Sequence, residues 1–384
     1  GKGVSRLTKR VRTEEKLLMT CGASAGLAAA FNAPLAGVLF SLEELHKNFS
    51  LDVLLPAMAS SITADVISRN IFGLKPVFDF SGIAMMPLKN YWLVPVLGLI
   101  LGLFGVLYNL CVDKAQNLYD KIKIPYIKTA IPFMLAGILG FVWPAVLGGG
   151  HGLIAGLTGQ TALWGLLGLL AVRFAYSILS FSAGVPGGIF LPLLVLGAVA
   201  GSLVGGTAAA VGLDVHLENF VILGMAGYFA AVVRAPVTGI LLICEMTGTL
   251  SHMLSLAMVS LIAYATADLL RSKPIYDQLL HRMLRRRRPE AEKAASGDKV
   301  LVNAPVHLGA PACGKRIGDA SWPAGCLIVS VRRGEEELVP KGNTRLRAGD
   351  DITVLCDEYD SEEVYRALEE QCKSTVIPRR THLK

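Results

Sequence analysis

The sequence predicts an all-α polytopic membrane protein with a small cytosolic α/β domain at its C-terminus. Three observations support this prediction: an apolar composition, an apolar motif that occurs twice, and a change of periodicity near residue 299. Of the 384 residues, 53% are hydrophobic and 17% are charged, and the mean hydropathy is +0.51. Because soluble domains carry about 25% charged residues, this composition excludes an ordinary soluble enzyme.

The repeated motif predicts that the apolar region consists of two related halves. Residues 28–45 read AAAFNAPLAGVLFSLEEL and residues 230–247 read AAVVRAPVTGILLICEMT. A second echo follows, because residues 273–277 (KPIYD) match residues 75–79 (KPVFD). Chains built from two such halves are commonly transporters, whose binding site lies between the repeats. The residue pairs shared at a constant offset of 202 are Gly22 and Gly224, Pro34 and Pro236, Gly37 and Gly239, and Glu43 and Glu245.

The two copies differ at two chemically important positions. Met246 in the second copy replaces Glu44 of the first, and Phe78 in the first echo corresponds to Tyr276 in the second. Positions that both copies share are expected to serve architecture, so the shared pair of glutamates is interpreted as structural, with buried hydrogen bonds to backbone. The differing positions are where we expect function to have broken the symmetry.

The apolar region, about residues 15–280, is divided by glycine and proline. Several of its segments are shorter than the roughly 20 residues that a helix needs to cross about 30 Å of hydrocarbon. Such segments predict discontinuous helices that end inside the membrane, where protein or a wet cavity must satisfy the free backbone groups. The predicted segments are 17–30, 32–46, 51–73, 92–118, 127–147, 161–181, 189–211, 219–233, 236–247 and 252–271.

Charge and cysteine content narrow the class further. The net charge of +7 is concentrated in basic runs at residues 6–12 and 281–288, which flank the apolar region. These runs have no interleaved aromatic residues, so residues 285–288 are interpreted as a cytoplasmic, positive-inside anchor rather than a nucleic-acid site. The seven cysteines include no C-x-x-C pair and no neighbouring His cluster, so no metal, cofactor or disulfide framework is predicted.

After a membrane domain at residues 1–284, the polar run 285–298 (RRRRPEAEKAASGD) predicts a linker to a second domain at residues 299–373. Residues 374–384 are expected to form a basic tail. The periodicity of the second domain predicts strands at 299–303, 326–332 and 351–356, a short helix near 315–320 and a final helix near 361–371.

Residues 181–192 (FSAGVPGGIFLP) show the pattern of an anion site. Glycines on both sides of Pro186 prevent a continuous helix, and an apolar helix then begins at Ile189. The first N–H groups of that helix have no partners within it, and the helix dipole adds partial positive charge. Such an end can bind an anion where it faces a cavity inside the membrane; the alternative is an ordinary helix–turn–helix connection. The candidate anion-binding residues of this segment are Gly187, Gly188, Ile189 and Phe190.

Tyr276 and Glu44 are the candidate side chains. The Tyr276 hydroxyl is a neutral donor that can bind an anion and release it; alternatively, this tyrosine is an interfacial aromatic residue after the last span. An acidic residue at membrane depth is unfavourable and often marks a proton path, which makes Glu44 the candidate proton-transfer residue. The alternative is that Glu44 lies in water at a helix end.

Four stretches together resemble the CLC family of chloride channels and chloride/proton antiporters. They are GLAAAFNAPLAGVLFSLEE, GVPGGIFLP, RAPVTGILLICEMT and KPIY, and the resemblance runs from residue 1 to about residue 282. The resemblance implies a homodimer with one anion pathway per subunit, built from inverted-topology halves. It also implies that the backbone amides of Ile189 and Phe190, with the Tyr276 hydroxyl, match the central anion site. Glu44 matches the inner proton-transfer glutamate of the antiporters, whereas the family's channels usually lack a carboxylate there.

The first half of this CLC-like inverted repeat is expected to be incomplete. If the second half begins near Tyr91, the offset of 202 residues places the start of the first roughly 110 residues before Gly1. The family's Gly-Ser-Gly-x-Pro loop and its Gly-Arg/Lys-Glu-Gly-Pro loop, which carries the gating glutamate, should lie in that upstream part. Fluoride-exporting relatives differ at these loops, so the choice among chloride, fluoride and nitrate stays open, although the second-half motifs look like the chloride type.

Residues 299–373 resemble the TrkA C-terminal domain, also called the RCK C-terminal unit, through the spacing of Gly314-Lys315, residues 328–333, residues 340–342 and Gly349-Asp350. Such domains pair with each other and can bind small regulatory ligands, so gating by a cytosolic metabolite is a hypothesis. Residues 309–315 imitate a phosphate-binding loop, but Arg316 stands where Ser or Thr is required, so nucleotide hydrolysis is not predicted.

These features predict a secondary active chloride/proton antiporter, a multi-pass protein of the cell membrane with a cytoplasmic C-terminal domain. Its expected partners are chloride or a similar small anion, protons, membrane lipid and a second copy of the chain. The alternatives are a passive voltage- or ligand-gated channel, a fluoride-selective exchanger, and a metabolite sensor with a membrane anchor. An intramembrane enzyme would need clustered His, Asp or Cys within the spans, so catalysis is not predicted.

Overall fold

The computed structural model describes residues 1–9, 12–46, 51–73, 77–78, 80, 83–157, 162–185, 187–287, 299–323, 325–334, 336–357 and 361–373. The chain divides into two compact units, Gly1–His281 and Arg282–Lys384, and each is described by itself. Residues 288–298 of the predicted linker, the predicted tail at 374–384, Pro186 and part of the 75–79 echo lie outside the described residues.

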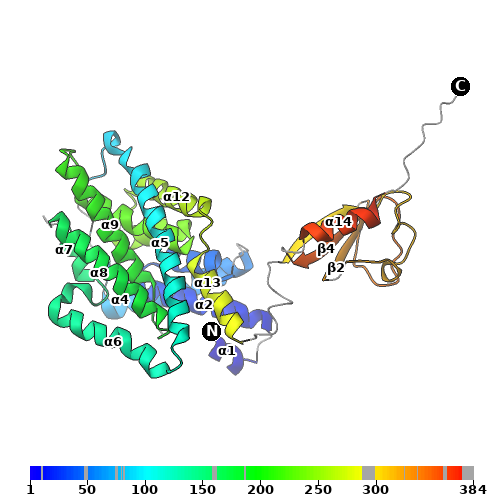
Figure 1. The fold of residues 1–384 in the computed structure, drawn as a ribbon, viewed down its shortest axis with the longest axis horizontal. Coiled ribbons are helices and arrows are strands. Elements are labelled where there is room, and N and C mark those ends of the chain that lie inside the picture. The colour runs from blue at the N-terminus through cyan, green and yellow to red at the C-terminus, as the bar shows by residue number, and fades with distance from the viewer. Residues whose placement is uncertain are drawn as a thin grey trace. The chain divides into compact units, whose positions relative to one another are not determined.

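The described part of the first unit is helical (Figure 1). A π-helix, η1 (Ser41–His46), continues α3, while 3₁₀ turns η2 (Leu88–Asn90) and η3 (Pro144–Val146) precede α5 and follow α6. The predicted apolar segments correspond to α2, α3 with η1, α4, α5, α6 and α8 to α12, whereas α1, α7 and α13 were not predicted because they are short or rich in charge. The helices are α1 (Lys2–Leu7), α2 (Arg12–Phe31), α3 (Pro34–Phe40), α4 (Leu51–Phe72), α5 (Leu93–Lys121), α6 (Pro125–Val142), α7 (His151–Gly156), α8 (Leu163–Ser182), α9 (Phe190–Ala210), α10 (Leu217–Val233), α11 (Pro236–Thr247), α12 (Met253–Leu269) and α13 (Ile275–Arg287).

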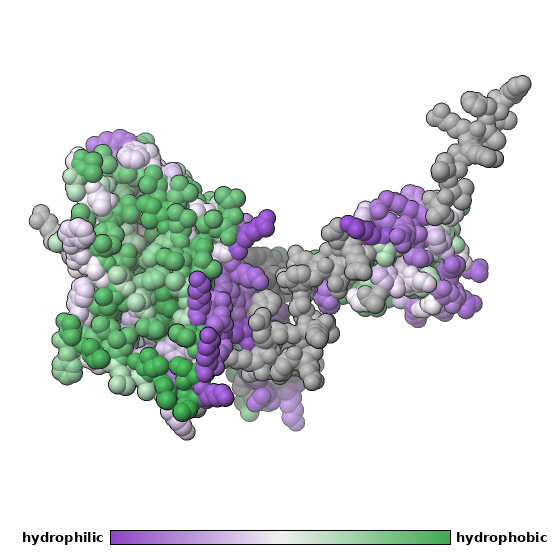
Figure 2. All heavy atoms as spheres, in the orientation of Figure 1, coloured by the Kyte–Doolittle hydropathy of each residue, from purple (hydrophilic) through white to green (hydrophobic). Residues whose placement is uncertain are grey.

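The helices of this unit have the length and surface of membrane helices. In the described part of the chain, α4, α5, α8 and α9 are long and apolar enough to cross a membrane, and α6, α10, α11 and α12 are shorter apolar helices. Large hydrophobic side chains are exposed along α4, α5 and α6, and Figure 2 shows hydrophobic residues over most of the visible face of this unit. Because water-soluble surfaces rarely expose apolar patches of this extent, we expect lipid to cover this face.

The two copies of the motif form two similar groups of three helices. α3 begins at Pro34 and α11 at Pro236, while α4 begins at Leu51 and α12 at Met253, so both pairs keep the offset of 202 residues. α2 packs against α3 and α4 as α10 packs against α11 and α12, and the two groups meet where α3 contacts α11. Proline suits the first position of α3 and α11 because the N–H that it lacks would have no partner within the helix.

Helix α10 forms the core of the first unit. Every residue of 219–233 is buried, because α5, α9, α11 and α12 pack around this helix. Its crossing with α9 depends on glycine: a methyl group on Gly201 would overlap the carbonyl oxygen of Phe220, and one on Gly224 would overlap that of Gly197. Small residues four apart let membrane helices approach this closely, so the glycines determine where α9 lies.

In the second unit, an antiparallel sheet carries one helix (Figure 1). Its strand order is β1-β4-β2-β3, and the helix packs against β1 and β4 through Val364 and Leu368, which are buried. The three predicted strands and the final helix are confirmed to within two residues. β3 was not predicted because it is only three residues long and belongs to a hairpin with β2. The elements are β1 (Lys299–Pro305), the 3₁₀ turn η5 (Ile317–Asp319), β2 (Leu327–Arg333), β3 (Glu336–Leu338), β4 (Asp350–Asp357) and α14 (Ser361–Cys372).

Candidate functional site

Three helix ends meet around the ring of Phe40. Phe40 ends α3, Phe190 begins α9, and Tyr276 lies in the first turn of α13. The centroid of the Phe40 ring is 4.8 Å from that of Phe190 and 5.7 Å from that of Tyr276, both in edge-to-face arrangements. The Phe190 ring also lies 5.9 Å from Phe31 and 4.8 Å from Phe229. The structure therefore brings two predicted anion-binding residues, Phe190 and Tyr276, onto one aromatic cluster.

The helix end predicted to bind an anion begins one residue later than the sequence suggested. α9 starts at Phe190, and Ile189 is its N-cap, a position that is half inside a helix and therefore hard to place from sequence. The first hydrogen bond of α9 runs from the Leu193 N–H to the Ile189 carbonyl oxygen at 3.1 Å, so the helix does not use the N–H groups of Ile189 and Phe190. Both of these residues are buried, whereas Gly187 and Gly188 are exposed in the connection that precedes them.

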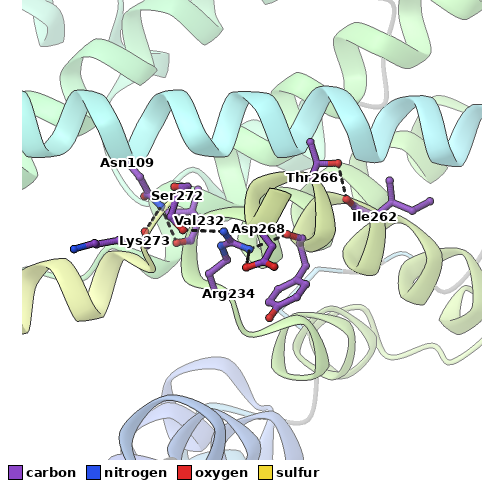
Figure 3. Close-up of polar contacts among 9 residues, drawn as sticks. Asn109, Val232, Arg234, Ile262, Thr266, Asp268, Ser272 and Lys273 are labelled. Atoms are coloured by element: carbon purple, nitrogen blue, oxygen red, sulfur yellow. Dashed lines mark hydrogen bonds and ion pairs between the residues drawn. The ribbon is translucent and has the colours of Figure 1, made fainter. Parts of the chain in front are cut away.

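Arg234 donates hydrogen bonds both to α12 and to the connection that leads from α12 to α13 (Figure 3). It is the left-handed C-cap of α10, with φ 72°, and it is 9% exposed. Its Nη1 donates to the Tyr264 carbonyl and its Nη2 to the Ser272 carbonyl, each at 2.8 Å. Asp268 lies 3.5 Å from Nη1, which makes it a looser partner for the guanidinium charge. The arginine thus ties the C-terminus of α10 to the chain immediately before α13.

Asn109 on α5 completes this attachment (Figure 3). Its Nδ2 donates to the carbonyls of Val232 and Lys273, each at 3.2 Å. Because Lys273 lies three residues before Tyr276, the bonds from Asn109 and Arg234 hold the backbone that leads to Tyr276. Arg234 and Asn109 are therefore positioning residues for Tyr276.

The comparison of the two motif copies did not identify Arg234, although its place just before an Ala-Pro helix start in the repeat was a signal. Its counterpart 202 residues earlier is Asn32, which also has a positive φ, 50°, and also precedes an Ala-Pro helix start. In the first copy the arginine lies on α4 rather than in the turn: Arg69 donates to the Asn32 carbonyl at 3.2 Å and pairs with Asp65 at 2.7 Å. A non-glycine residue with positive φ is uncommon, so its occurrence at equivalent positions marks a turn that both halves require.

The glutamates shared by both copies cap each other's helices. Glu245, near the end of α11, accepts the N–H groups of Leu35 at 3.0 Å and Ala36 at 2.8 Å in the first turn of α3. Glu43, just beyond α3, accepts the N–H of Thr238 at 3.0 Å and its hydroxyl at 2.7 Å in the first turn of α11. The predicted structural role of this pair is confirmed. Because each carboxylate lies at the end of one helix and the start of the other, α3 and α11 run antiparallel, as inverted halves require.

Glu44 lies beside Glu43 in η1, the π-helical turn that follows α3. π-turns are rare and occur frequently at functional sites, whereas α11 passes through the equivalent residue, Met246, as a regular α-helix. The half-buried Glu44 carboxylate lies within electrostatic range of the Tyr276 hydroxyl. In the other copy the Phe78 N–H donates to the Met246 carbonyl at 2.9 Å. In each half, therefore, the position that follows the shared glutamate interacts with the aromatic residue of the echo, through charge in one half and through backbone in the other.

Both units match known families. Residues 1–268 match the family described as voltage gated chloride channel, and residues 301–369 match the TrkA-C domain. The chain is 37% identical over 309 residues to the H(+)/Cl(-) exchange transporter ClcA of Salmonella typhi, an alignment that covers 77% of this chain and 64% of that protein. The chain thus spans slightly less than two thirds of the length of the curated relatives that it resembles.

Solved structures with the same fold include two antiporters. A slow cyanobacterial Cl-/H+ antiporter is 29% identical, with a TM-score of 0.68, and the match covers 74% of this chain and 68% of that one. A CLC-type fluoride/proton antiporter is 25% identical, with a TM-score of 0.58, and the match covers 71% of this chain and 67% of that one. The helical arrangement is therefore shared by proteins whose transported anions differ.

Proposed function

The chain belongs to the voltage-gated chloride channel (CLC) family, and on this premise we propose that the full-length protein is a secondary active antiporter that exchanges chloride for protons. Membership of this family makes the chain part of a multi-pass membrane protein of anion transport rather than an enzyme. The observation that favours exchange over passive conduction is the placement of Glu44, in a π-turn within electrostatic range of Tyr276.

In this proposal the anion is held by neutral donors. The N–H groups of Ile189 and Phe190 lie at the positive end of α9, and the Tyr276 ring joins the same aromatic cluster through Phe40. Dipoles of this kind stabilise an anion in a site that excludes water, yet they carry no full charge to trap it. Gly187 and Gly188 leave the approach to this helix end free of side chains. The site can therefore bind a desolvated anion and still release it.

The proton in this proposal is carried by Glu44. A carboxylate can accept a proton from water on one side and pass it on, which a methionine at the equivalent position cannot do. Its neighbour Glu43 accepts two hydrogen bonds from the first turn of α11, so we assign Glu43 to structure and the proton to Glu44. The π-turn allows two adjacent glutamates to serve these different tasks.

The test uses the full-length protein in liposomes with an imposed chloride gradient, with proton uptake and chloride efflux recorded together. We expect the wild type to drive protons uphill. Glu44→Gln keeps the size of the side chain and one acceptor oxygen but cannot carry a proton, so we expect chloride flux without proton movement. Asp52→Asn, which neutralises an exposed carboxylate in the first turn of α4, serves as the matched control and should keep coupling intact.

Three other outcomes would each replace the proposal. Chloride flux without proton movement in the wild type would make the protein a channel. Proton coupling that Glu44→Gln leaves unchanged would assign the proton to another residue. Coupled transport of fluoride in strong preference to chloride would place the protein with the fluoride/proton antiporters.

The C-terminal unit is proposed to lie in the cytoplasm and to regulate transport. The basic run at the end of α13, which leads to this unit, suits the cytoplasmic side of a membrane, where positive residues concentrate. Pairing of the unit with its copy in a homodimer, and binding of a small cytosolic ligand, are the forms of regulation that we propose. Ligand-dependent transport that deletion of residues 299–373 abolishes would support this role, and transport indifferent to the deletion would contradict it.

A further inference from the structure

The C-terminal unit has two cysteines at neighbouring positions of its sheet. Cys356 lies in β4, and Cys326 comes directly before β2, which pairs antiparallel with β4. Because Leu327 of β2 is opposite Leu355 of β4, the next pair of positions in the same register is Cys326 and Cys356. Directly opposed residues of an antiparallel pair have Cβ atoms about 4.5–5.5 Å apart. The register therefore places the two thiols next to each other.

Both cysteines face the hydrophobic core between the sheet and α14. Cys356 is fully buried in this core, and Cys326 is half-buried and packs against it. Side chains alternate between the two faces of a strand, and Leu327, the residue after Cys326, is 63% exposed on the opposite face. Burial raises the pKa of the Cys326 thiol, and the nearby Cys356 thiol raises this pKa further. The two sulfur atoms are therefore close enough to interact on the same face of the sheet.

The other two cysteines of this unit lie at the opposite end of the sheet. The His307 N–H, just after β1, donates to the Cys372 carbonyl at 2.8 Å. The N–H of the residue before Cys313 donates to the carbonyl of the residue before Cys372 at 3.0 Å, so Cys313 lies at that end as well. Cys356 is instead opposite Val300, near the start of β1. The length of β1 therefore separates Cys313 and Cys372 from Cys356, which leaves Cys326 as its neighbouring thiol.

We propose that Cys326 and Cys356 form a reversible thiol–disulfide exchange site whose substrate is a small disulfide, the oxidised form of a low-molecular-weight thiol. Cys326, the accessible member, loses its proton and attacks the small disulfide, whose S–S bond breaks as a bond to Cys326 forms and one small thiol leaves. Cys356 then loses its proton and attacks the Cys326 sulfur, which releases the second small thiol. Two protein thiols are thus oxidised to one disulfide, and one small disulfide is reduced to two thiols.

Only a small movement is needed to join the pair. A disulfide requires Cβ atoms about 3.5–4.5 Å apart, so an opposed cross-strand pair must approach by roughly 1 Å. The movement falls on Cys326, which lies outside β2 and follows Gly325, a residue with a φ of 82°. The Cys326 thiol donates to the Pro323 carbonyl at 3.1 Å, and oxidation would break this bond. Because its raised pKa makes Cys326 a slow nucleophile at neutral pH, we expect oxidation to take minutes to hours.

The position of the pair suits a signal to the rest of the chain. Lys299, the first residue of β1, is opposite Asp357, the residue after Cys356, so the linker enters the unit at the same end of the sheet. A disulfide there would fix β2 to β4 beside this entry. The chemistry of the pair is independent of the proposed function, whereas its effect on transport rests on the proposed regulatory role of this unit. A cytoplasmic location suits a transient disulfide of this kind, because permanent ones are rare there.

The test incubates the full-length protein with oxidised glutathione, blocks the remaining thiols by alkylation and maps disulfides by mass spectrometry. We expect a link between the peptides of Cys326 and Cys356 that dithiothreitol reverses. Cys326→Ala should abolish the link, whereas Cys313→Ala, which removes another half-buried thiol of the same core, should keep it. In the oxidised protein, hydrogen exchange in β4 should slow by about thirtyfold or more, the lower range for a disulfide that closes a loop.

The outcomes separate the site from its role. Glutathione attached to Cys326 without the internal link would overturn the site, and so would a link from Cys356 to Cys313 or Cys372. The internal link in a protein that moves chloride without protons would support the site and overturn only the antiporter proposal. Oxidised and reduced wild type should differ in the rate of chloride flux, while Cys326→Ala should not respond. Equal rates for the two forms of the wild type, with the link present, would overturn only the role in transport.

Discussion

The reciprocal caps between the two halves provide a quantitative test of the inverted-repeat architecture. The perturbation is Glu245→Gln, which keeps the shape of the side chain and removes its charge. The carboxylate accepts two N–H groups of α3, from Leu35 at 3.0 Å and Ala36 at 2.8 Å, at the positive end of that helix. Glutamine retains one acceptor oxygen and turns its amide toward the second N–H, so one charge-assisted bond is lost and the other is weakened.

The expected magnitude follows from these bonds. A hydrogen bond to a charged group contributes about 1.5–3 kcal/mol, and an N-cap substitution costs about 0.5–2 kcal/mol. We therefore expect Glu245→Gln to lower the free energy of unfolding by about 2 kcal/mol, and Glu245→Ala, which removes both bonds, by about 3 kcal/mol. At about 2–4 °C per kcal/mol, the glutamine variant should lower Tm by about 4 °C or more.

The assay is thermal unfolding of the detergent-solubilised full-length protein. Glu43→Gln should have a similar effect, because Glu43 makes the equivalent bonds to Thr238 at the start of α11. Asp214→Asn is the control: Asp214 pairs with Lys89 at 3.3 Å, but both side chains are largely exposed, so the expected loss is below about 1 kcal/mol. If Glu245→Gln shifts Tm no more than this control does, the caps do not hold the halves together and the reasoning is wrong.

The remaining predictions concern positioning, packing and pH. Arg234→Lys cannot donate to two carbonyls from separate nitrogens, so we expect it to loosen the connection before α13 and to weaken chloride binding, measured calorimetrically, by about tenfold. An unchanged affinity would contradict the positioning role. Gly201→Ala should prevent stable folding of the helical unit, because the added methyl group would overlap the backbone of α10. Gly137→Ala is the control: nothing lies within 4 Å of the added methyl group, so Tm should stay unchanged or rise slightly. Equal expression and equal Tm for the two variants would refute the packing argument. Burial alone would raise the pKa of the Asp350 carboxyl, but its bidentate pairing with Arg333 at 2.8 Å and the Arg347 N–H hold the pKa below its ordinary 3.8. The stability from this pair should therefore be present above about pH 4 and lost as pH falls below it, and hydrogen exchange in β4 should show this loss in wild type and not in Asp350→Asn.

The sequence alone predicts the elements well where the signal is local. Hydrophobic runs bounded by proline and glycine place α9 to α12 to within a few residues, because the pattern that drives a helix into lipid lies within that helix. The offset between Pro34 and Pro236 predicts two related groups of three helices. Local signals are weaker for β3, which is short and stabilised by its partner strand, and for the π-turn at Glu44, which sequence comparison with the second copy does not reveal.

The candidate site, like the fold, could be predicted from the sequence only in part. The sequence points to Tyr276, Glu44 and the start of α9 as separate features, since each differs from its repeat counterpart or breaks a helical pattern. It does not predict that Tyr276 and Phe190 meet on Phe40, because these ring contacts join residues from three distant segments. Nor does it identify Arg234, because its two shortest hydrogen bonds go to backbone carbonyls, which side-chain identities along the chain do not reveal.

What the sequence by itself determined is the membrane class, the duplicated halves, the small C-terminal sheet unit and the residues whose chemistry suits an anion and a proton. What only the tertiary structure decided is how the halves fit together. Glu245 reaches Leu35 across 210 residues and Glu43 reaches Thr238 across 195. Composition and periodicity act over a few residues and can be read along the chain, whereas a cap or a ring contact depends on which distant segment packing brings into contact.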